Sequence, residues 1–323
     1  CLFALVKLLL TALMWEVYPV LLRNYRLSYN DGRDPYQHSP ALCRAHPLED
    51  SEEQVVLLMS YYSIDHKLHT GEYWPILANA SHMNHLAFAH TYNLSYVRAG
   101  QGHPRCGKLR NVHRELEQLP ESAWLFFVDA DVGLTGCQYL RGKEDLSLSQ
   151  YVSRWHKSVK RHDAGLNVDL LILKKFGIFA VRNSAWSRSY IRRLADAVEG
   201  RRLLCDFSVP ENWAYHAVTT QEDYCHLSEL VFEDRKLRLF SRDTNITFLH
   251  LHGSSAKDDE QRVRQFVGLL HEQSLCLSLS KRTGPPIRVM SIVAQEPKEV
   301  FFPPPLQKGE RAVWTHLARR AKR

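Results

Sequence analysis

Residues 124–134, WLFFVDADVGL, place two carboxylates directly after one of the most apolar runs of the chain. The run 124–128 predicts a buried strand, because short continuous apolar stretches are typical of strands in a covered sheet. Asp129 and Asp131 then lie where the strand ends, and open α/β sheets bind ligands outside the carboxyl ends of their strands. Two hard oxygen donors one residue apart predict a site for Mg²⁺ or Mn²⁺, completed by water and phosphate oxygens. The alternative is a turn in which the aspartates cap the following segment.

The segments before this strand alternate between strand and helix patterns. Residues 54–62 (QVVLLMSYY) and 94–100 (LSYVRAG) have the composition of strands. Between them, a helix is predicted to pack through one face, formed by Ile76, Ala80, Met83 and Ala87. A second helix ends at Pro120 and shows helical spacing of Leu109, Val112, Leu116 and Leu119. This alternation predicts an α/β fold with a largely parallel sheet covered on both sides.

The segments after the strand are less regular. Residues 169–175 (DLLILKK) and 177–182 (GIFAVR) are predicted strands, and 246–253 (ITFLHLHG) contains a late one. A helix over 184–198 presents Trp186, Tyr190, Leu194 and Val198 on one side. The helix that follows the late strand is predicted to pack through Val263, Phe266, Val267 and Leu270.

Composition narrows the class of protein. The chain has 323 residues, and 45% hydrophobic residues indicate a globular protein with a sizeable core. The net charge of +7 favours an anionic ligand or a membrane surface. No RNA-binding or zinc-finger signature is present, so nucleic acid is not an expected partner. The seven cysteines include no CxxC pair, which disfavours structural zinc and leaves one or two disulfides or ordinary buried thiols.

The sequence divides into four segments. Residues 1–22 form an apolar segment that we interpret as a truncated signal-anchor, with a packed N-terminal helix as the alternative. Residues 23–53 resemble a stem, 54–278 form the catalytic domain, and 279–323 form a loop-rich basic tail. Three glycosylation sequons, at Asn79, Asn93 and Asn245, favour a secretory-pathway lumen. We therefore expect a Golgi or ER membrane protein whose catalytic domain is luminal.

A P-loop NTPase is one alternative for the aspartates. Residues 102–108 (GHPRCGK) match G-x₄-G-K between a strand and a helix, with Asp129 as the acid of the second nucleotide-binding motif. Leu109 stands where a P-loop has the Ser or Thr that holds Mg²⁺, and Pro104 removes one phosphate-binding N–H. Both features disfavour this alternative.

Four motifs in order resemble glycosyltransferase family 34, the galactosyl-, xylosyl- and mannosyltransferases, over about residues 55–257. The family's Lys, P-E-x-x-W and D-x-D run is matched by Lys108, residues 120–124 (PESAW) and residues 129–131 (DAD). Its G-x-F…R-N-x-x-W motif is matched by Gly177, Phe179, Arg182, Asn183 and Trp186. Its D-D-Q stretch resembles residues 221–223 (QED), and its H-x-x-G motif is matched by residues 250–253 (HLHG), with Lys257 beyond.

The resemblance implies a GT-A type nucleotide-diphospho-sugar transferase fold, Rossmann-like with flanking helices. It implies a Mn²⁺- or Mg²⁺-dependent hexosyl- or pentosyltransferase that uses a UDP- or GDP-sugar, retains anomeric configuration and glycosylates a glycan or glycoprotein acceptor. Lys175 stands where the family has an Asn, which keeps a catalytically inactive sugar-nucleotide-binding homologue open as an alternative.

The resemblance also implies roles for individual residues. Asp131 binds the metal directly, Asp129 binds the metal or the ribose, and His250 is a third protein ligand, with His252 as its competitor. Lys108 and Lys257 neutralise the diphosphate, and Gly177 and Gly253 are positions that contact the donor. Near the transferred sugar, the candidate catalytic residues are Glu222, Asp223 and Lys108.

Overall fold

The structure is a computed structural model of the chain. The residues that it describes are 54–62, 73–100, 102–103, 106–135, 147–153, 168–174, 176–200, 205, 210–220, 222–229, 248–251 and 260–279. The predicted signal-anchor and stem, and all but the first residue of the predicted tail, lie outside this part of the chain. Within it, no helix combines the length and the apolar composition needed to cross a bilayer.

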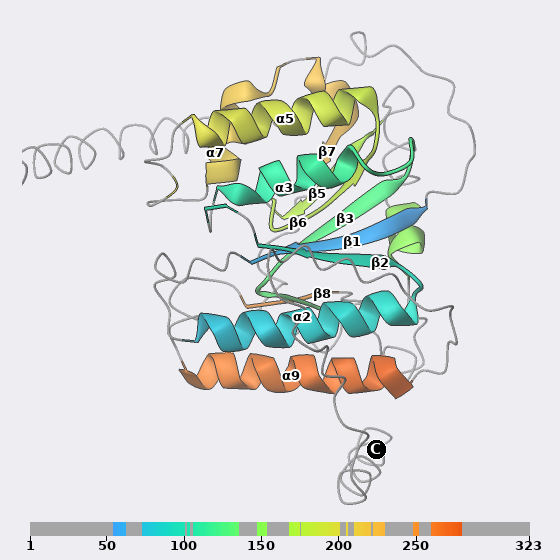
Figure 1. The fold of residues 1–323 in the computed structure, drawn as a ribbon, viewed down its shortest axis with the longest axis vertical. Coiled ribbons are helices and arrows are strands. Elements are labelled where there is room, and N and C mark those ends of the chain that lie inside the picture. The colour runs from blue at the N-terminus through green and yellow to red at the C-terminus, as the bar shows by residue number, and fades with distance from the viewer. Residues whose placement is uncertain are drawn as a thin grey trace, which may run out of the picture.

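The centre of the fold is a six-stranded sheet in the order β2-β1-β3-β6-β5-β7 (Figure 1). Its strands are β1 Val55–Tyr61, β2 Ser95–Ala99, β3 Trp124–Asp129, β5 Leu170–Lys174, β6 Ile178–Arg182 and β7 Leu227–Glu229. Only β6 runs against the others: it is antiparallel to β3 and β5, whereas β1–β2, β1–β3 and β5–β7 are parallel pairs. Three residues join β5 to β6, too few for the crossover that a parallel pair requires. The predicted α/β fold with a mostly parallel sheet is confirmed.

Helices cover both faces of this sheet (Figure 1). On one side lie α3 (Gly107–Leu116), α5 (Ala185–Glu199) and α7 (Pro210–Val218). On the other side, α2 (Trp74–Thr91) lies next to the sheet, and α9 (Glu260–Leu279) packs on α2. The sheet is therefore inaccessible from its faces, and a ligand can reach it only at its edges.

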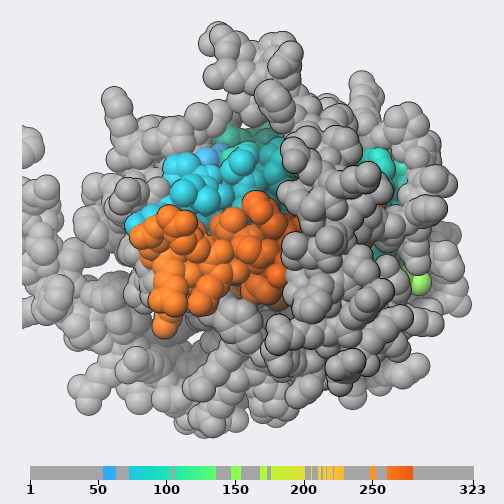
Figure 2. Space-filling view, turned by 90° about the horizontal axis from the view of Figure 1, so that it is seen from below, coloured from blue at the N-terminus to red at the C-terminus, as the bar shows by residue number. Residues whose placement is uncertain are grey.

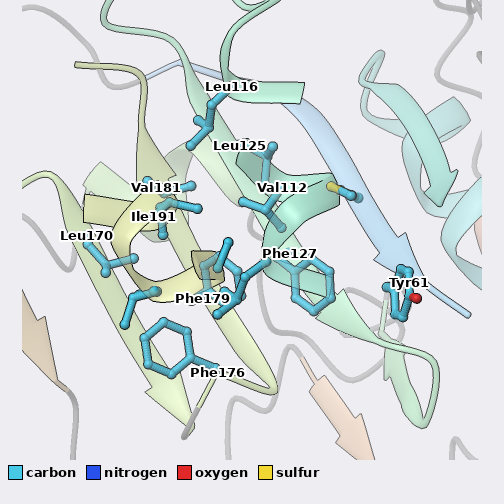
Figure 3. Close-up of a cluster of buried hydrophobic side chains, with 14 of the residues drawn as sticks. Tyr61, Val112, Leu116, Leu125, Phe127, Leu170, Phe176, Phe179, Val181 and Ile191 are labelled. Carbon is cyan, nitrogen blue, oxygen red and sulfur yellow. The ribbon is translucent and has the colours of Figure 1, made fainter. Parts of the chain in front are cut away.

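Residues of β3 alternate between the two halves of the core. Leu125 and Phe127 face α3 and α5, where Phe127 stacks on Phe179 with ring centroids 4.8 Å apart (Figure 3). Trp124, Phe126 and Val128 face the other side and pack near α2. The side chains of all five β3 residues from Trp124 to Val128 are fully buried, as expected of a strand covered on both faces. The predicted buried strand is confirmed.

A second, two-stranded antiparallel sheet lies beyond the end of β3. It pairs β4 (Val132–Leu134) with β8 (Phe248–His250). The other edge of β4 is occupied by side chains of α2. The Asn84 carboxamide donates to the Leu134 carbonyl at 3.0 Å and accepts from the Leu134 N–H at 2.7 Å. His85 Nε2 donates to the Val132 carbonyl at 2.6 Å. These side chains satisfy the edge of β4 as a third strand would.

The packing face predicted for α2 was wrong. Ile76 is 56% exposed, and Met83 and Ala87 are only half-buried, so of the predicted positions Ala80 alone is buried. The buried side of the helix instead combines apolar and polar residues, among them Leu77, Ser81, Asn84, His85 and Phe88. The apolar spacing was misleading because the helix must also supply hydrogen-bonding groups to β4.

The other predicted helix faces are confirmed. Leu109, Val112 and Leu116 of α3 are fully buried, and Leu119 is partly buried beyond the end of the helix. In α5, Tyr190, Leu194 and Val198 are buried and Trp186 is partly buried. In α9, Val263, Phe266 and Leu270 are buried and Val267 packs beside them.

Candidate active site

The two aspartates lie where the chain passes from the central sheet into the small one. Asp129 is the last residue of β3, and its backbone N–H donates to the Gly177 carbonyl at 2.8 Å. Asp131 immediately precedes β4. Because β6 is antiparallel to β3, the turn before β6 lies at the carboxyl end of β3. Gly177, a predicted donor-contacting residue, therefore supports the backbone of Asp129.

The small sheet brings Asp131 to His250. Val132 and His250 are paired across β4 and β8, and the Leu251 N–H donates to the Asp131 carbonyl at 3.0 Å. His250 Nε2 consequently lies 3.4 Å from Asp131 Oδ2. The Asp131 residue is only 4% exposed. Two of the predicted metal ligands, far apart in the sequence, are thus held together by backbone pairing.

Lys108 is turned into the protein. Its ammonium lies 2.8 Å from Asp129 Oδ1 and 2.9 Å from Glu211 Oε1, and it donates to the Phe176 carbonyl at 3.2 Å. An ammonium has three protons, so these contacts match its donors one to one. The sequence predicted that Lys108 neutralises a diphosphate. That role stays a prediction, and the geometry directs all three donors at acceptors of the protein.

Three carboxylates and one ammonium lie in this cluster of described residues. Asp129, Asp131 and Glu211 carry three negative charges when ionised, against the one positive charge of Lys108. Burial raises the pKa of Asp129 to about 6, with the Asp131 and Glu211 carboxylates acting in the same direction and Lys108 opposing them. Burial by itself lowers the pKa of Lys108, but the Asp129 and Glu211 carboxylates outweigh it and raise that pKa. Carboxylates gathered at a sheet edge are the oxygen ligands that a divalent cation prefers.

The donor set fits such a cation. Carboxylates suit Mg²⁺ and Mn²⁺ alike, whereas an imidazole is a ligand that transition metals accept more readily than Mg²⁺. The 3.4 Å approach of His250 Nε2 to Asp131 Oδ2 would allow one ion to contact both. The Asp129 side chain is 29% exposed and one of its oxygens contacts Lys108. The ligand atoms of Asp129, Asp131 and His250 do not all lie within 4.8 Å of one another, so Asp131 and His250 are the pair of described residues that fits Mn²⁺.

The candidate catalytic acids lie in a different environment. Asp223, in the 3-10 turn η4 (Asp223–His226), accepts from Arg193 at 2.6 Å and from the Trp186 indole at 3.0 Å. It also accepts from the Thr220 N–H and hydroxyl at 2.8 and 2.9 Å. Burial raises the pKa of Asp223, but these hydrogen bonds outweigh it and hold that pKa below its usual value. Glu222 is exposed. A role for either residue near the sugar stays a prediction.

Several residues that carry the family resemblance make structural contacts. Arg182 pairs with the buried Asp169 at 2.6 Å. The Asn183 carboxamide donates to the Leu119 and Pro120 carbonyls at 2.7 and 3.1 Å. The Asn183 contacts fix the loop before β3 against the end of β6, and the Arg182–Asp169 pair fixes the start of β5 there, so this part of the motif preserves the register of the sheet.

Other predicted positions lie outside the described residues. They are Gly253, Lys257 and His252 after β8, together with Lys175 and Gln221. The P-loop alternative, like the predicted diphosphate role, requires Lys108 to reach a phosphate, whereas the Lys108 ammonium donates to Asp129, Glu211 and the Phe176 carbonyl. Both stay predictions.

Sequence reasoning missed Glu211. It follows Pro210 at the start of α7, where an acid is expected simply because the helix dipole favours it. Nothing in the local pattern indicates that this carboxylate reaches Lys108. Asn84 and His85 were missed for a similar reason, since a polar residue inside an apolar helix pattern carries no sign of its partner.

A groove of about 680 Å³ lies at the ends of β1 and β2. It is lined by residues at the ends of β1 and β2, by the first turns of α2 and by α9: Tyr62, Pro75, Ile76, Asn79, Ala80, Arg98, Ala99, Gly100, Val267 and His271. The Tyr62 ring packs in a cluster with Ala130, which stands between the two aspartates, and the Arg98 guanidinium lies 5.1 Å from the centre of that ring. Figure 2 shows α2 and α9 side by side on one face of the molecule.

Comparison with protein-family models and with curated proteins finds no match. Among solved structures, the chain is similar to a glycosyltransferase involved in the glycosylation of the major capsid of PBCV-1, with 9% identity and a TM-score of 0.42 over 68% of this chain and 99% of that one. It is also similar to the glycosyltransferase GlyE of Streptococcus pneumoniae, with 12% identity and a TM-score of 0.38 over 70% of this chain. The match spans 63% of GlyE, in its apo form as well. At these identities and TM-scores, nothing about the chemistry of this chain follows from the similarity.

Proposed function

We propose that the chain is a metal-dependent glycosyltransferase that moves a hexose or pentose from a nucleotide-diphosphate sugar to a glycan acceptor with retention of configuration. The observation that carries this proposal is the approach of His250 to Asp131 within 3.4 Å at the carboxyl end of β3, beside Asp129. A carboxylate and an imidazole held together at that edge, with a second carboxylate nearby, support a cation site of the kind that glycosyl transfer from a diphosphate donor requires.

Each site residue has a task in this reaction. Asp131 and His250 would hold Mn²⁺, and Asp129 would contribute its second oxygen to the ion or to the ribose. When bound, the ion stabilises the negative charge of the departing nucleoside diphosphate. The bond from the anomeric carbon to the diphosphate oxygen breaks and its electron pair stays on that oxygen. The acceptor hydroxyl oxygen forms its bond to the same face of that carbon, and its proton passes to the departing diphosphate or to water.

The groove supports a nucleotide donor. A volume of about 680 Å³ suits a ligand of that size, and Pro75, Ile76 and Val267 make part of its lining apolar. Tyr62, which lines the groove, belongs to the same packing cluster as Ala130, the residue between the two aspartates. Arg98 adds a positive charge at the same end of the sheet, which favours an anionic ligand.

The compartment and the acceptor are part of the proposal. We place the catalytic domain in the Golgi or ER lumen, held there by the N-terminal segment and acting on a glycan or glycoprotein. The Cys106–Cys205 disulfide supports an oxidising compartment, and Cys225 and Cys276 are disulfide-bonded as well. Asn93, one of the predicted glycosylation sites, is exposed and is not among the residues that line the groove.

Thermal denaturation with UDP- and GDP-sugars, each with and without Mn²⁺, tests the proposal. A donor present at 100 times its Kd should stabilise the protein by about 2.7 kcal/mol, and only when Mn²⁺ is present. Asp131→Asn should abolish the Mn²⁺-dependent part, whereas Asp196→Asn, an exposed carboxylate on α5, should not. Stabilisation that survives Asp131→Asn, or no stabilisation by any donor, would contradict the proposal. Release of nucleoside diphosphate in the presence of acceptor separates an active enzyme from an inactive homologue.

A further inference from the structure

Glu211 and Lys108 form a buried pair behind the exposed side of Asp129. Side-chain exposure is 5% for Glu211 and 9% for Lys108, against 29% for Asp129. Of these three side chains, Asp129 alone therefore offers substantial surface to a ligand. The pair lies on the protein side of that carboxylate.

We infer that Glu211 and Lys108 are positioning residues of the active site, which hold one oxygen of Asp129 and leave the other for the metal or the donor. This inference rests on the proposed function and deepens it. It assigns Lys108 to the protein interior, and it gives a role to a residue of α7 that does not contact the substrate.

The contacts of the ammonium support this assignment. Lys108 Nζ lies 2.8 Å from Asp129 Oδ1, 2.9 Å from Glu211 Oε1 and 3.2 Å from the Phe176 oxygen. All three protons have an acceptor, so contact with a phosphate would require Lys108 to give up at least one of them.

Charge gives the second reason. If Lys108 turned toward a phosphate, the Asp129 and Glu211 carboxylates would remain close together and unpaired in a largely buried setting. Removing one partner of a buried ion pair is strongly unfavourable, because it leaves an uncompensated charge. Lys108 is therefore held in place by both acids at once.

The surrounding fold fixes all three groups. Lys108 lies in α3 and Glu211 lies in α7. The disulfide Cys106–Cys205 joins the residue directly before α3 to a residue of the segment before α7. The turn between β5 and β6 supplies the Phe176 carbonyl to Lys108 and the Gly177 carbonyl to the backbone of Asp129. Phe176 has φ 56°, a conformation that non-glycine residues rarely adopt. Two separate structural constraints thus converge on Asp129.

Two substitutions at Glu211 test the inference. Glu211→Gln keeps an oxygen that accepts from Lys108, so Mn²⁺ affinity and kcat should stay within about threefold of the parent. Glu211→Leu removes the acceptor. Mn²⁺ affinity or kcat should then fall about 10- to 100-fold, as is typical when a residue that orients a metal ligand is lost. The KM for the donor should change less than kcat, because Lys108 does not contact the diphosphate. Mn²⁺ affinity is measured by electron paramagnetic resonance.

Matched variants control for the removal of a buried acid. Glu115, on the same helix as Lys108, is 4% exposed and pairs with Arg114, so Glu115→Gln and Glu115→Leu should leave Mn²⁺ affinity and kcat unchanged. If Glu211→Leu fails to fold, Lys108→Met combined with Glu211→Leu removes the two charges together. The double variant should show the same loss of Mn²⁺ affinity as Glu211→Leu, because in both variants Asp129 is no longer held in position by the Lys108–Glu211 pair.

The outcomes separate the inference from the proposed function. If the parent protein binds neither Mn²⁺ nor a nucleotide-sugar, the proposed function is overturned and the inference with it. If the parent binds both and Glu211→Leu matches it in Mn²⁺ affinity and kcat, only the inference is overturned. A more than tenfold rise in the donor KM for Lys108→Met, with kcat unchanged, would instead assign Lys108 to the diphosphate.

Discussion

His85 shows how one buried side chain adjusts to its surroundings. It is fully buried in α2, where Nε2 donates to the Val132 carbonyl. Burial lowers the pKa of His85 to about 4, and the positive charge of Arg98 acts in the same direction, against the opposing Val132 hydrogen bond. Burial also lowers the pKa of His82, on the preceding turn of the same helix, to about 3. Both imidazoles are therefore neutral in the folded protein at the pH of most compartments.

The lowered pKa of His85 predicts an acid-sensitive fold. A lowered folded-state pKa means that the unfolded chain binds more protons, so stability is complete above about pH 6.5 and falls as the pH drops toward 4. Lowering a pKa by one corresponds to about 1.4 kcal/mol, so His85 should account for about 3 kcal/mol across that window. Urea denaturation at several pH values should show this loss, and a smaller one in His85→Gln. Parallel pH profiles for parent and variant would contradict the prediction.

At the scale of residues, the sequence indicated which residues belong to the candidate site but did not indicate which other residues they contact. Asp129, Asp131 and His250 were selected by their chemistry and by the family motifs, and the structure brings Asp131 and His250 within 3.4 Å. The buried Lys108–Glu211 contact could not be predicted, because an ion pair between α3 and α7 depends on where two helices lie and leaves no local pattern.

At the scale of elements, β4 is held from three sides. It pairs with β8, its other edge binds Asn84 and His85 of α2, and its centre faces α9. A Cβ added at Gly133 would lie 2.1 Å from Leu270 Cδ2, and Leu270 is fully buried. Glycine is needed here so that the strand that follows the aspartates can approach α9 closely.

Gly133→Ala should therefore destabilise the protein by about 1–3 kcal/mol through overpacking. Leu270→Ala by itself should cost about 2–5 kcal/mol, but the double variant should cost at least about 1 kcal/mol less than the sum, because the smaller side chain removes the clash. Gly268→Ala is the matched control, since an added Cβ there meets nothing within 4 Å. Equal unfolding free energies for Gly133→Ala and Gly268→Ala would refute the close approach.

The predictions for helices and strands were correct where the buried residues are all apolar. They were wrong where apolar and polar residues are buried together. The pattern of β3 predicted a buried strand correctly because both of its faces make apolar contacts. The predicted face of α2 was wrong because its buried side includes Asn84 and His85, which bind the edge of β4. Apolar periodicity identifies a packed face only when the neighbour has no backbone hydrogen bonds to satisfy.

At the scale of the whole molecule, the Cys106–Cys205 disulfide joins positions 99 residues apart. Closing so long a loop restricts the unfolded chain, so its removal should cost about 2–5 kcal/mol. Cys106→Ala combined with Cys205→Ala should lower the Tm under oxidising conditions, where the bonds of Cys225 and Cys276 remain intact. An unchanged Tm would show that the link is dispensable. A parallel fall in Mn²⁺ affinity would indicate that the same link also helps to place Lys108 and Glu211.

The sequence by itself determined the class of fold, the buried strand and the acidic pair at its end, because these follow from local composition and from the order of elements along the chain. Tertiary structure decided which groups meet at that end. It turned Lys108 inward toward Glu211, set Asp223 among Arg193, Trp186 and Thr220, and used α2 to complete the edge of β4. Those contacts join segments distant in sequence, and their energies come from burial and pairing that no single segment contains.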